Sequence, residues 1–342
     1  MAARLTSNPL KYIPKPSRRE VFTIILLIAE IIIFAVITPN FLNPVNLERV
    51  LRNATDLAIV SIGMTIVILM GGVDISVGSA LGVVAIIVGW MLQAGNDPIL
   101  IAVVAVVAGT LIGSINGLLI TVARIPDIIV TLGTANIWRA AVFGMLNGEW
   151  LTGLPPVFAT LTRGRILDIP VSVFILLIFY VLFWLVLTFL PFGRHIYAVG
   201  NSEEAAELAG IKAKRTRAIG YAILGGLVGF ASLLYVGRLG SVEITVGNDL
   251  AIASIAAVVI GGAAVTGGRG SVIGTLAGVL FIAVMRNGIV LLGIPSLWER
   301  AVVGILIVVF VTADIFINHQ AQRRRQQQRV RRGISLAASR AD

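Results

Sequence analysis

Residues 193–217 read GRHIYAVGNSEEAAELAGIKAKRTR and interrupt a chain that is otherwise mostly apolar. Fifty-seven per cent of the 342 residues are hydrophobic and only 13% are charged, whereas soluble domains are about a quarter charged. Several apolar runs exceed the roughly 18 residues that a helix needs to cross a bilayer. Because helices satisfy their own backbone hydrogen bonds in lipid, the composition predicts an all-α polytopic membrane protein.

The apolar runs predict about ten transmembrane helices in one domain, residues 21–316, between basic tails at 1–20 and 317–342. The predicted spans are 21–38, 57–70, 79–93, 99–122, 126–146, 171–190, 218–236, 250–265, 272–293 and 298–314. A short surface helix is expected at 47–53, within a polar loop.

The net charge of +10 is concentrated in the tails and in loops between apolar runs. This distribution follows the positive-inside rule and indicates a membrane rather than nucleic acid. Ten spans put both termini and the 193–217 loop in the cytoplasm and the 147–170 loop outside. The chain has no cysteine, which excludes thiol catalysis and thiolate metal sites.

Two glycine-rich segments are expected to break helices. The candidate residues in them are Gly71, Gly72, Asp74, Ser76, Gly78 and Ser79, and then Gly261, Gly262, Gly270 and Ser271. Broken helices at membrane depth often mark a transport pathway. The alternative for the first segment is an ordinary turn, with Asp74 solvated and Ser76 or Ser79 capping the next helix, and the spacing alone favours that turn slightly.

The fifth span carries Thr131, Thr134 and Asn136, which predict that part of it lines a polar interior. In the fourth span, glycines at 109, 113 and 117 have the spacing of close helix packing. Glu30, a single carboxylate in the first span, is interpreted as a packed or protonated group. DLAIVSI at 56–62 recurs as DLAIASI at 249–255, which suggests an internal duplication, although membrane composition alone can produce such a match.

Within the 193–217 stretch, either Asn201 or Ser202 can cap a short helix that has Glu203 and Glu204 in its first turn. Gly210 is placed to close this helix as a C-terminal glycine. The helix would carry a flank of small residues, Ala205, Ala206 and Ala209, on which another surface can approach. The alternative is a solvated helix that only connects two spans.

The pattern EAA, followed three residues later by glycine, resembles the coupling loop of permease subunits of bacterial ABC importers. Four ordered motifs resemble the ribose/galactose-type monosaccharide permeases over about residues 21–314: GGVDISVGS at 71–79, IPDIIVTLGT at 125–134, FGRHIYAVGNSEEAAELAGI at 192–211 and GGAAVTGGRGS at 261–271. NGEWLTGLP at 147–155 is more similar to the autoinducer or rhamnose branch.

The resemblance implies a bacterial inner-membrane importer of a monosaccharide or a related solute. Its expected partners are a cytoplasmic ATP-binding subunit, a second permease subunit and a periplasmic sugar-binding protein. The coupling residues would be Asn201, Glu203, Glu204, Ala205, Ala206 and Gly210. ATP would bind the partner, because a phosphate-binding loop ends in Gly-Lys-Ser/Thr and none of the lysines here follows a glycine.

The residues alone leave two other functional classes to consider. An ion-coupled secondary transporter would use Glu30, Asp74 and Asp314 as intramembrane carboxylates. An intramembrane enzyme is disfavoured, because His195 and His319 lie at membrane edges and no HExxH motif is present.

Overall fold

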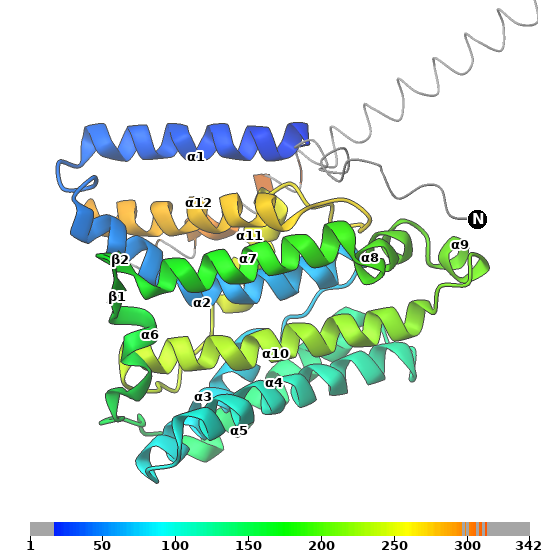
Figure 1. Cartoon of the computed structure of the whole chain (residues 1–342), viewed down its shortest axis with the longest axis horizontal. Coiled ribbons are helices and arrows are strands. Elements are labelled where there is room, and N and C mark those ends of the chain that lie inside the picture. The colour runs from blue at the N-terminus through cyan, green and yellow to red at the C-terminus, as the bar shows by residue number, and fades with distance from the viewer. Residues whose placement is uncertain (1–16, 296–297, 299–300, 306–307, 310–311, 313–342) are drawn as a thin grey trace, which may run out of the picture.

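The computed structural model describes residues 17–295, 298, 301–305, 308–309 and 312. Within them the chain is a bundle of roughly parallel and antiparallel helices (Figure 1). In this described part of the chain, seven helices are long and apolar enough to cross a membrane, and two shorter apolar helices accompany them. The prediction of an all-α polytopic fold is confirmed.

The helices up to the middle of the chain are α1 (Arg18–Ile37), α2 (Pro44–Leu69), α3 (Val77–Gln93), α4 (Pro98–Thr121) and α5 (Asp127–Leu146). A small subdomain follows, made of η2 (Pro156–Phe158), α6 (Ala159–Arg163), β1 (Arg165–Ile166) and β2 (Ile169–Pro170). The remaining helices are α7 (Val171–Phe189), α8 (Pro191–Asn201), α9 (Glu203–Leu208), α10 (Ala213–Leu239), α11 (Leu250–Ile260) and α12 (Val272–Leu291).

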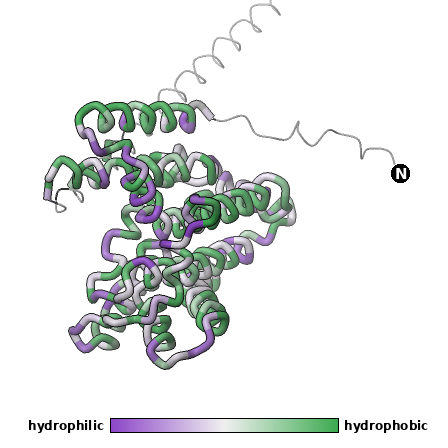
Figure 2. Tube along the Cα trace, turned by 60° about the vertical axis from the view of Figure 1, so that its left-hand side comes forward, coloured by the Kyte–Doolittle hydropathy of each residue, from purple (hydrophilic) through white to green (hydrophobic). Residues whose placement is uncertain are grey.

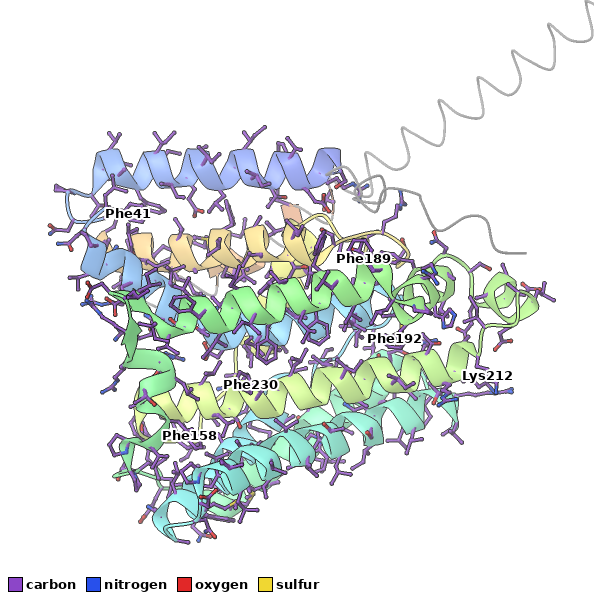
Figure 3. All side chains as sticks on the ribbon, viewed as in Figure 1. Phe41, Phe158, Phe189, Phe192, Lys212 and Phe230 are labelled. Atoms are coloured by element: carbon purple, nitrogen blue, oxygen red, sulfur yellow. The ribbon has the colours of Figure 1, made fainter. Side chains whose placement is uncertain are left out.

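The bundle has two distinct ends. One carries α6 and the antiparallel pair β1–β2 and is called here the α6 end; the other carries α8 and α9 and is called the α9 end (Figure 1). Apolar residues run along the helices and polar residues gather at turns (Figure 2). Lys212 lies at the α9 end and Phe158 near the α6 end (Figure 3).

α4 and α10 pack closely against each other. A Cβ on Gly109 would lie 2.2 Å from Gly225 O, and one on Gly113 would lie 2.3 Å from Tyr221 O. Both distances are too short for any side chain, so the two backbones touch. The predicted role of the glycines at 109, 113 and 117 in close packing is confirmed.

The second span was predicted to begin at 57, but α2 is one continuous helix from Pro44. Asn43 caps it by accepting from Val45 N, and Pro44 suits the first helical position. Two polar residues of its first turns bond other elements: Asn46 and Asn287 exchange amide hydrogen bonds of 2.8 and 2.9 Å, and Glu48 pairs with Arg165. The separate surface helix at 47–53 is therefore wrong, because this segment continues into α2 without a break.

Three further boundaries differ from the prediction. Residues 191–201 form the helix α8 rather than part of a loop, and α10 begins at Ala213 instead of 218. The span predicted at 250–265 ends at Ile260, where the second glycine-rich segment begins. The predicted tenth span, 298–314, lies only partly within the described residues. Both basic tails and Asp314 lie outside them, apart from residues 17–20.

Candidate functional site: a capped helix, two glycine turns and a polar cavity

Ser202 precedes the short helix α9, and its Oγ accepts a hydrogen bond from Ala205 N at 3.2 Å. Ser202 is therefore the cap, and the alternative that Asn201 caps the helix is wrong. Asn201 is the last residue of α8, and its Nδ2 donates to Tyr197 O at 2.7 Å. Glu203 and Glu204 lie in the first turn of α9, where carboxylates suit the positive end of the helix dipole.

Gly210 closes α9 with a left-handed backbone, φ +84°. Gly210 N donates to Glu207 O at 2.9 Å and Ile211 N donates to Ala206 O at 3.0 Å. These two bonds form a Schellman motif, which satisfies the last carbonyls of a helix. The predicted glycine closure is confirmed.

The small-residue flank of α9 is divided between its two sides. Ala206 is buried against Val199 and Ala213 and anchors α9 to α8 and α10, so it is not open to another surface as predicted. Ala205 and Ala209 are exposed beside Leu208, whose side chain is 85% exposed. Sequence reasoning missed Leu208, although a leucine in a charged segment was a usable signal.

The first glycine turn, residues 71–76, contains a buried polar cluster. Asp74 is 2% exposed and accepts from Ser76 N at 2.8 Å, Ser76 Oγ at 2.7 Å and Asn116 Nδ2 at 3.1 Å. The alternative of a solvated Asp74 is therefore wrong, and Ser76 occupies the cap position of α3 without a side-chain capping bond. Gly78 and Ser79 follow, buried in the first turn of α3.

The second glycine turn, residues 261–271, packs against the first turn and against α1 and α12. A Cβ on Gly261 would lie 2.4 Å from Gly274 O, and Gly262 has φ +93°. Ser271 caps α12 by accepting from Gly274 N and donates to Glu20 on α1 at 2.6 Å. Gly268 N donates to Leu69 O at 2.8 Å, so the second turn is bonded to the last residue of α2, just before the first turn.

The polar residues of α5 do not share one face. Thr131 and Thr134 are buried, whereas Asn136 is exposed and bonds its own backbone at Leu132 O. The structure therefore brings Thr131 to the first glycine turn, where it lies 3.4 Å from Val73 O, and leaves Asn136 on the outside of the chain.

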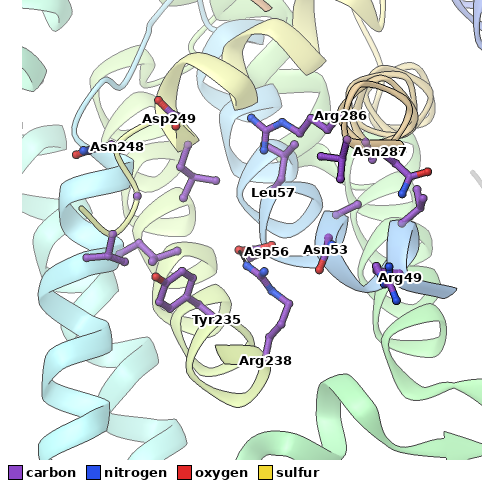
Figure 4. Close-up of a pocket in the computed structure, with 18 of the residues that line it drawn as sticks. Arg49, Asn53, Asp56, Leu57, Tyr235, Arg238, Asn248, Asp249, Arg286 and Asn287 are labelled. Atoms are coloured by element: carbon purple, nitrogen blue, oxygen red, sulfur yellow. Dashed lines mark hydrogen bonds and ion pairs between the residues drawn. The ribbon is translucent and has the colours of Figure 1, made fainter. Parts of the chain in front are cut away.

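A cavity of about 410 Å³ lies toward the α6 end, between the first turns of α2, the last turns of α10 and α12, and the loop before α11 (Figure 4). Its polar lining includes Arg49, Asn53, Asp56, Arg238, Asn248 and Asp249. The volume is within the roughly 300–1,000 Å³ of small-molecule pockets. None of the predicted pathway residues lines it.

The aspartates that begin the two copies of the repeat, Asp56 and Asp249, both line this cavity. The repeat was therefore the sequence signal for the cavity, but it was not interpreted that way. Asp56 is 9% exposed and its Oδ2 accepts from Arg238 at 2.7 Å. The guanidinium of Arg238 lies 5.7 Å from the centre of the Tyr235 ring, which also lines the cavity.

Of the carboxylates named for an ion-coupled transporter, the two within the described residues, Glu30 and Asp74, do not meet. Glu30 lies on α1, whereas Asp74 is bonded to Asn116 of α4, and these helices are on opposite faces of the bundle (Figure 1). In the described residues there is also no group of three His, Cys, Asp or Glu side chains that could hold a metal ion.

The fold and these features define a multi-pass α-helical membrane protein with a short capped helix at one end and a polar cavity toward the other. Residues 46–311 match the family described as branched-chain amino acid transport system / permease component, and the chain belongs to this family. It is thus a transport component, which favours a permease over the ion-coupled alternative.

Named relatives cover most of the chain. The ribose import permease protein RbsC of Bacillus subtilis (strain 168) is 38% identical over 286 residues, 83% of this chain and 89% of that protein. RbsC of Escherichia coli (strain K12) is 34% identical over 90% of this chain and 98% of its own length. The autoinducer 2 import system permease protein LsrC of Salmonella typhi is 29% identical over 95% of this chain and 93% of its own length. No solved structure gives a significant match.

Proposed function

We propose that this chain is the permease subunit of an ATP-driven importer for a monosaccharide or a related small polyhydroxylated solute. Relatives named for ribose and autoinducer 2 import support this solute class. The observation that carries the proposal is α9, a helix fixed at both ends that presents Glu203, Glu204 and Leu208 outward.

In this proposal α9 is the docking element for a separate ATP-binding subunit. The Schellman motif at Gly210 and the burial of Ala206 fix the position of α9 on α8 and α10. Exposed Leu208 provides an apolar contact and the two glutamates provide charged ones, a combination typical of interface residues around an apolar centre. Asn201 supports the same unit from the end of α8.

The cavity near the α6 end is proposed as the place where the solute enters. Sugars present many hydroxyl groups, and the cavity offers carboxylates, guanidinium groups and amides that donate and accept hydrogen bonds. The ring of Tyr235 adds an apolar face for the carbon skeleton. Solute delivered by a periplasmic binding protein at the α6 end would reach these groups first.

The two glycine turns are proposed to border the inner part of the pathway. Gly71, Gly72, Asp74, Ser76, Gly78, Ser79, Gly261, Gly262, Gly270 and Ser271 would belong to this part, with Thr131 and Thr134. Their tight packing closes that part in the present conformation, so solute would pass only when the turns move. Exposed Asn136 would then face the second permease subunit.

The proposal includes an orientation in the bacterial inner membrane. The α9 end would face the cytoplasm, because the ATP-binding subunit is there, and the 147–170 segment would face outside. Basic residues at the α9 end, such as Lys212 and Lys214, agree with the positive-inside rule. Both termini would lie in the cytoplasm.

The test is to purify the complex from its native membrane through a tag on this chain and to reconstitute it in liposomes. We expect an ATP-binding subunit to co-purify and ATP hydrolysis to rise severalfold with a binding protein loaded with D-ribose or another small sugar. Uptake that persists without ATP and collapses with an uncoupler would instead support an ion-coupled transporter.

A further inference from the structure

The side chain of Arg217, in the second turn of α10, holds two other elements. Its Nη2 donates to both oxygens of Asp127 at 3.0 and 2.9 Å, and its Nη1 donates to Glu203 of α9 at 3.1 Å. Asp127 is the first residue of α5, and both side chains of this pair are largely buried, 19% and 13% exposed. One nitrogen of the planar guanidinium therefore contacts both carboxylate oxygens of Asp127 while the other contacts Glu203, and such charge-assisted bonds fix geometry as well as charge.

Asp127 in turn touches the first glycine turn. Tyr221 Oη, one helical turn beyond Arg217, donates to Asp127 Oδ2 at 3.0 Å and lies 3.4 Å from Val73 O. A Cβ on Gly72 would meet Asp127 Oδ2 at 2.5 Å and Tyr221 Oη at 2.7 Å. The backbone of the turn therefore rests on this carboxylate and this hydroxyl with no space between them.

A second set of contacts joins α8 to the other glycine turn. Tyr197 Oη donates to Gly270 O at 2.9 Å. A Cβ on Gly200 would lie 1.8 Å from Leu69 O and 2.6 Å from Gly268 N. Burial, together with the charge of Glu20, raises the pKa of Tyr197 to about 12, so its hydroxyl remains a donor at neutral pH.

We propose that Arg217, Asp127 and Tyr197 are positioning residues that connect helices α8 and α9 to the two glycine turns. Arg217 and Asp127 connect α9 to the first turn, and Tyr197 connects α8 to the second. A displacement of α9 would move Arg217 and, with it, the start of α5 and the turn at 71–76. A displacement of α8 would move the turn at 261–271. This inference rests on the proposed function, because it names how force applied at α9 reaches the pathway.

Energetic coupling between α9 and the glycine turns is measured by chemical labelling of each turn. Because the chain has no cysteine, an introduced cysteine is its single thiol, and its labelling is read after this chain is separated from the partner subunits. Val73→Cys reports on the first turn and Val265→Cys on the second, where Val265 is 40% exposed. The measurement is the rate of maleimide labelling in the purified complex, without nucleotide and with MgATP plus vanadate.

In the otherwise native complex we expect nucleotide to change the labelling rate at each reporter at least about fivefold. Arg217→Gln and Asp127→Asn should reduce the change at Val73→Cys to less than twofold and leave the change at Val265→Cys. Tyr197→Phe removes the hydrogen bond to Gly270 O and should reduce the change at Val265→Cys more than the change at Val73→Cys. Arg215→Gln removes the same charge from an exposed position on α10 and serves as the matched control, so it should preserve both changes.

Arg217→Lys guards against a folding defect, because it keeps the charge but has one nitrogen in place of the two that contact Asp127 and Glu203. It should give an intermediate change at Val73→Cys in a complex that still assembles. The inference is overturned if Arg217→Gln leaves the response at Val73→Cys intact, if Arg215→Gln abolishes it equally, or if neither reporter responds in the native complex. Failure of any ATP-binding subunit to co-purify with the native chain would contradict the proposed function itself.

Discussion

Gly78 and Gly247 touch backbone to backbone. A Cβ on Gly78 would lie 2.0 Å from Gly247 O, and one on Gly247 would lie 2.1 Å from Gly78 O. Gly78 is in the first turn of α3, whereas Gly247 lines the cavity in the loop before α11. This contact joins the first turn of α3 to the cavity lining. It therefore connects the first glycine turn with the cavity, the two regions proposed to contact the solute.

Gly78→Ala should therefore destabilise the fold. The added methyl group has no space, and overpacking costs about 1–3 kcal/mol. Thermal unfolding in detergent measures the effect. Gly133→Ala on α5 is the control, because a Cβ there meets nothing within 4 Å, and it should be neutral or slightly stabilising. Equal melting temperatures for the two variants would contradict the packing described here.

Gly210 is required for its backbone conformation and not for space. Its φ is +84° and a Cβ would meet nothing within 4 Å. Gly210→Asn should be tolerated, since asparagine accepts the left-handed region, whereas Gly210→Ala should weaken the closure of α9 by about 1 kcal/mol. Thermal unfolding and co-purification of the ATP-binding subunit measure the two effects.

Gly210→Arg adds bulk at the proposed docking surface. We expect it to abolish co-purification and solute-stimulated ATP hydrolysis, while Gly210→Asn retains both. If Gly210→Arg left assembly and stimulation intact, α9 would not be the docking element.

Asp56 and Arg238 form a largely buried pair in the cavity, with side chains 12% and 20% exposed. Asp56→Asn and Arg238→Gln should each lower stability, and the double variant should lose less than the sum, with a coupling of about 0.5–3 kcal/mol. Asp97→Asn, an exposed carboxylate at the start of α4, is the control and should show no coupling with Arg238→Gln. If the stability losses of Asp56→Asn and Arg238→Gln were strictly additive in the double variant, the pair would not be formed.

Water access should distinguish the cavity from the glycine turns. Asn53→Cys and Asn248→Cys, in the cavity lining, should react with aqueous thiol reagents at rest. Ser76→Cys and Thr134→Cys, which are buried, should react only during ATP turnover, when the turns are proposed to move. Ala58→Cys on α2 is the buried control. Uniform protection of Ser76→Cys and Thr134→Cys during turnover would exclude them from the pathway.

The two loop regions lie at opposite ends of the bundle (Figure 1). Reporter fusions after Trp150 and after Asn201 should therefore give opposite sides of the membrane, with Asn201 in the cytoplasm. The same side for both would contradict the proposed orientation.

Much of the fold follows from local patterns. Apolar runs of span length predicted the helices, and the glycines of α4 predicted its contact with α10. The closure of α9 at Gly210 was also predictable, because a cap depends on residues three to five positions apart. The same local reasoning left Asn201 and Ser202 as equal caps, since both have suitable side chains and only the backbone path distinguishes them.

The tertiary structure alone decided which distant residues meet. Arg217 looked like one basic residue among several beside Gly210, but it is bonded to Asp127, 90 positions earlier. Asp56 and Asp249 were visible as a repeat, yet their shared cavity depends on how α2 and α11 pack. The physical reason is that helix formation and capping are set by neighbours along the chain, whereas partners across helices depend on the rotation and register of each packed helix. The sequence determined a membrane bundle with a capped helix in its central charged stretch, and tertiary packing determined what that helix is connected to.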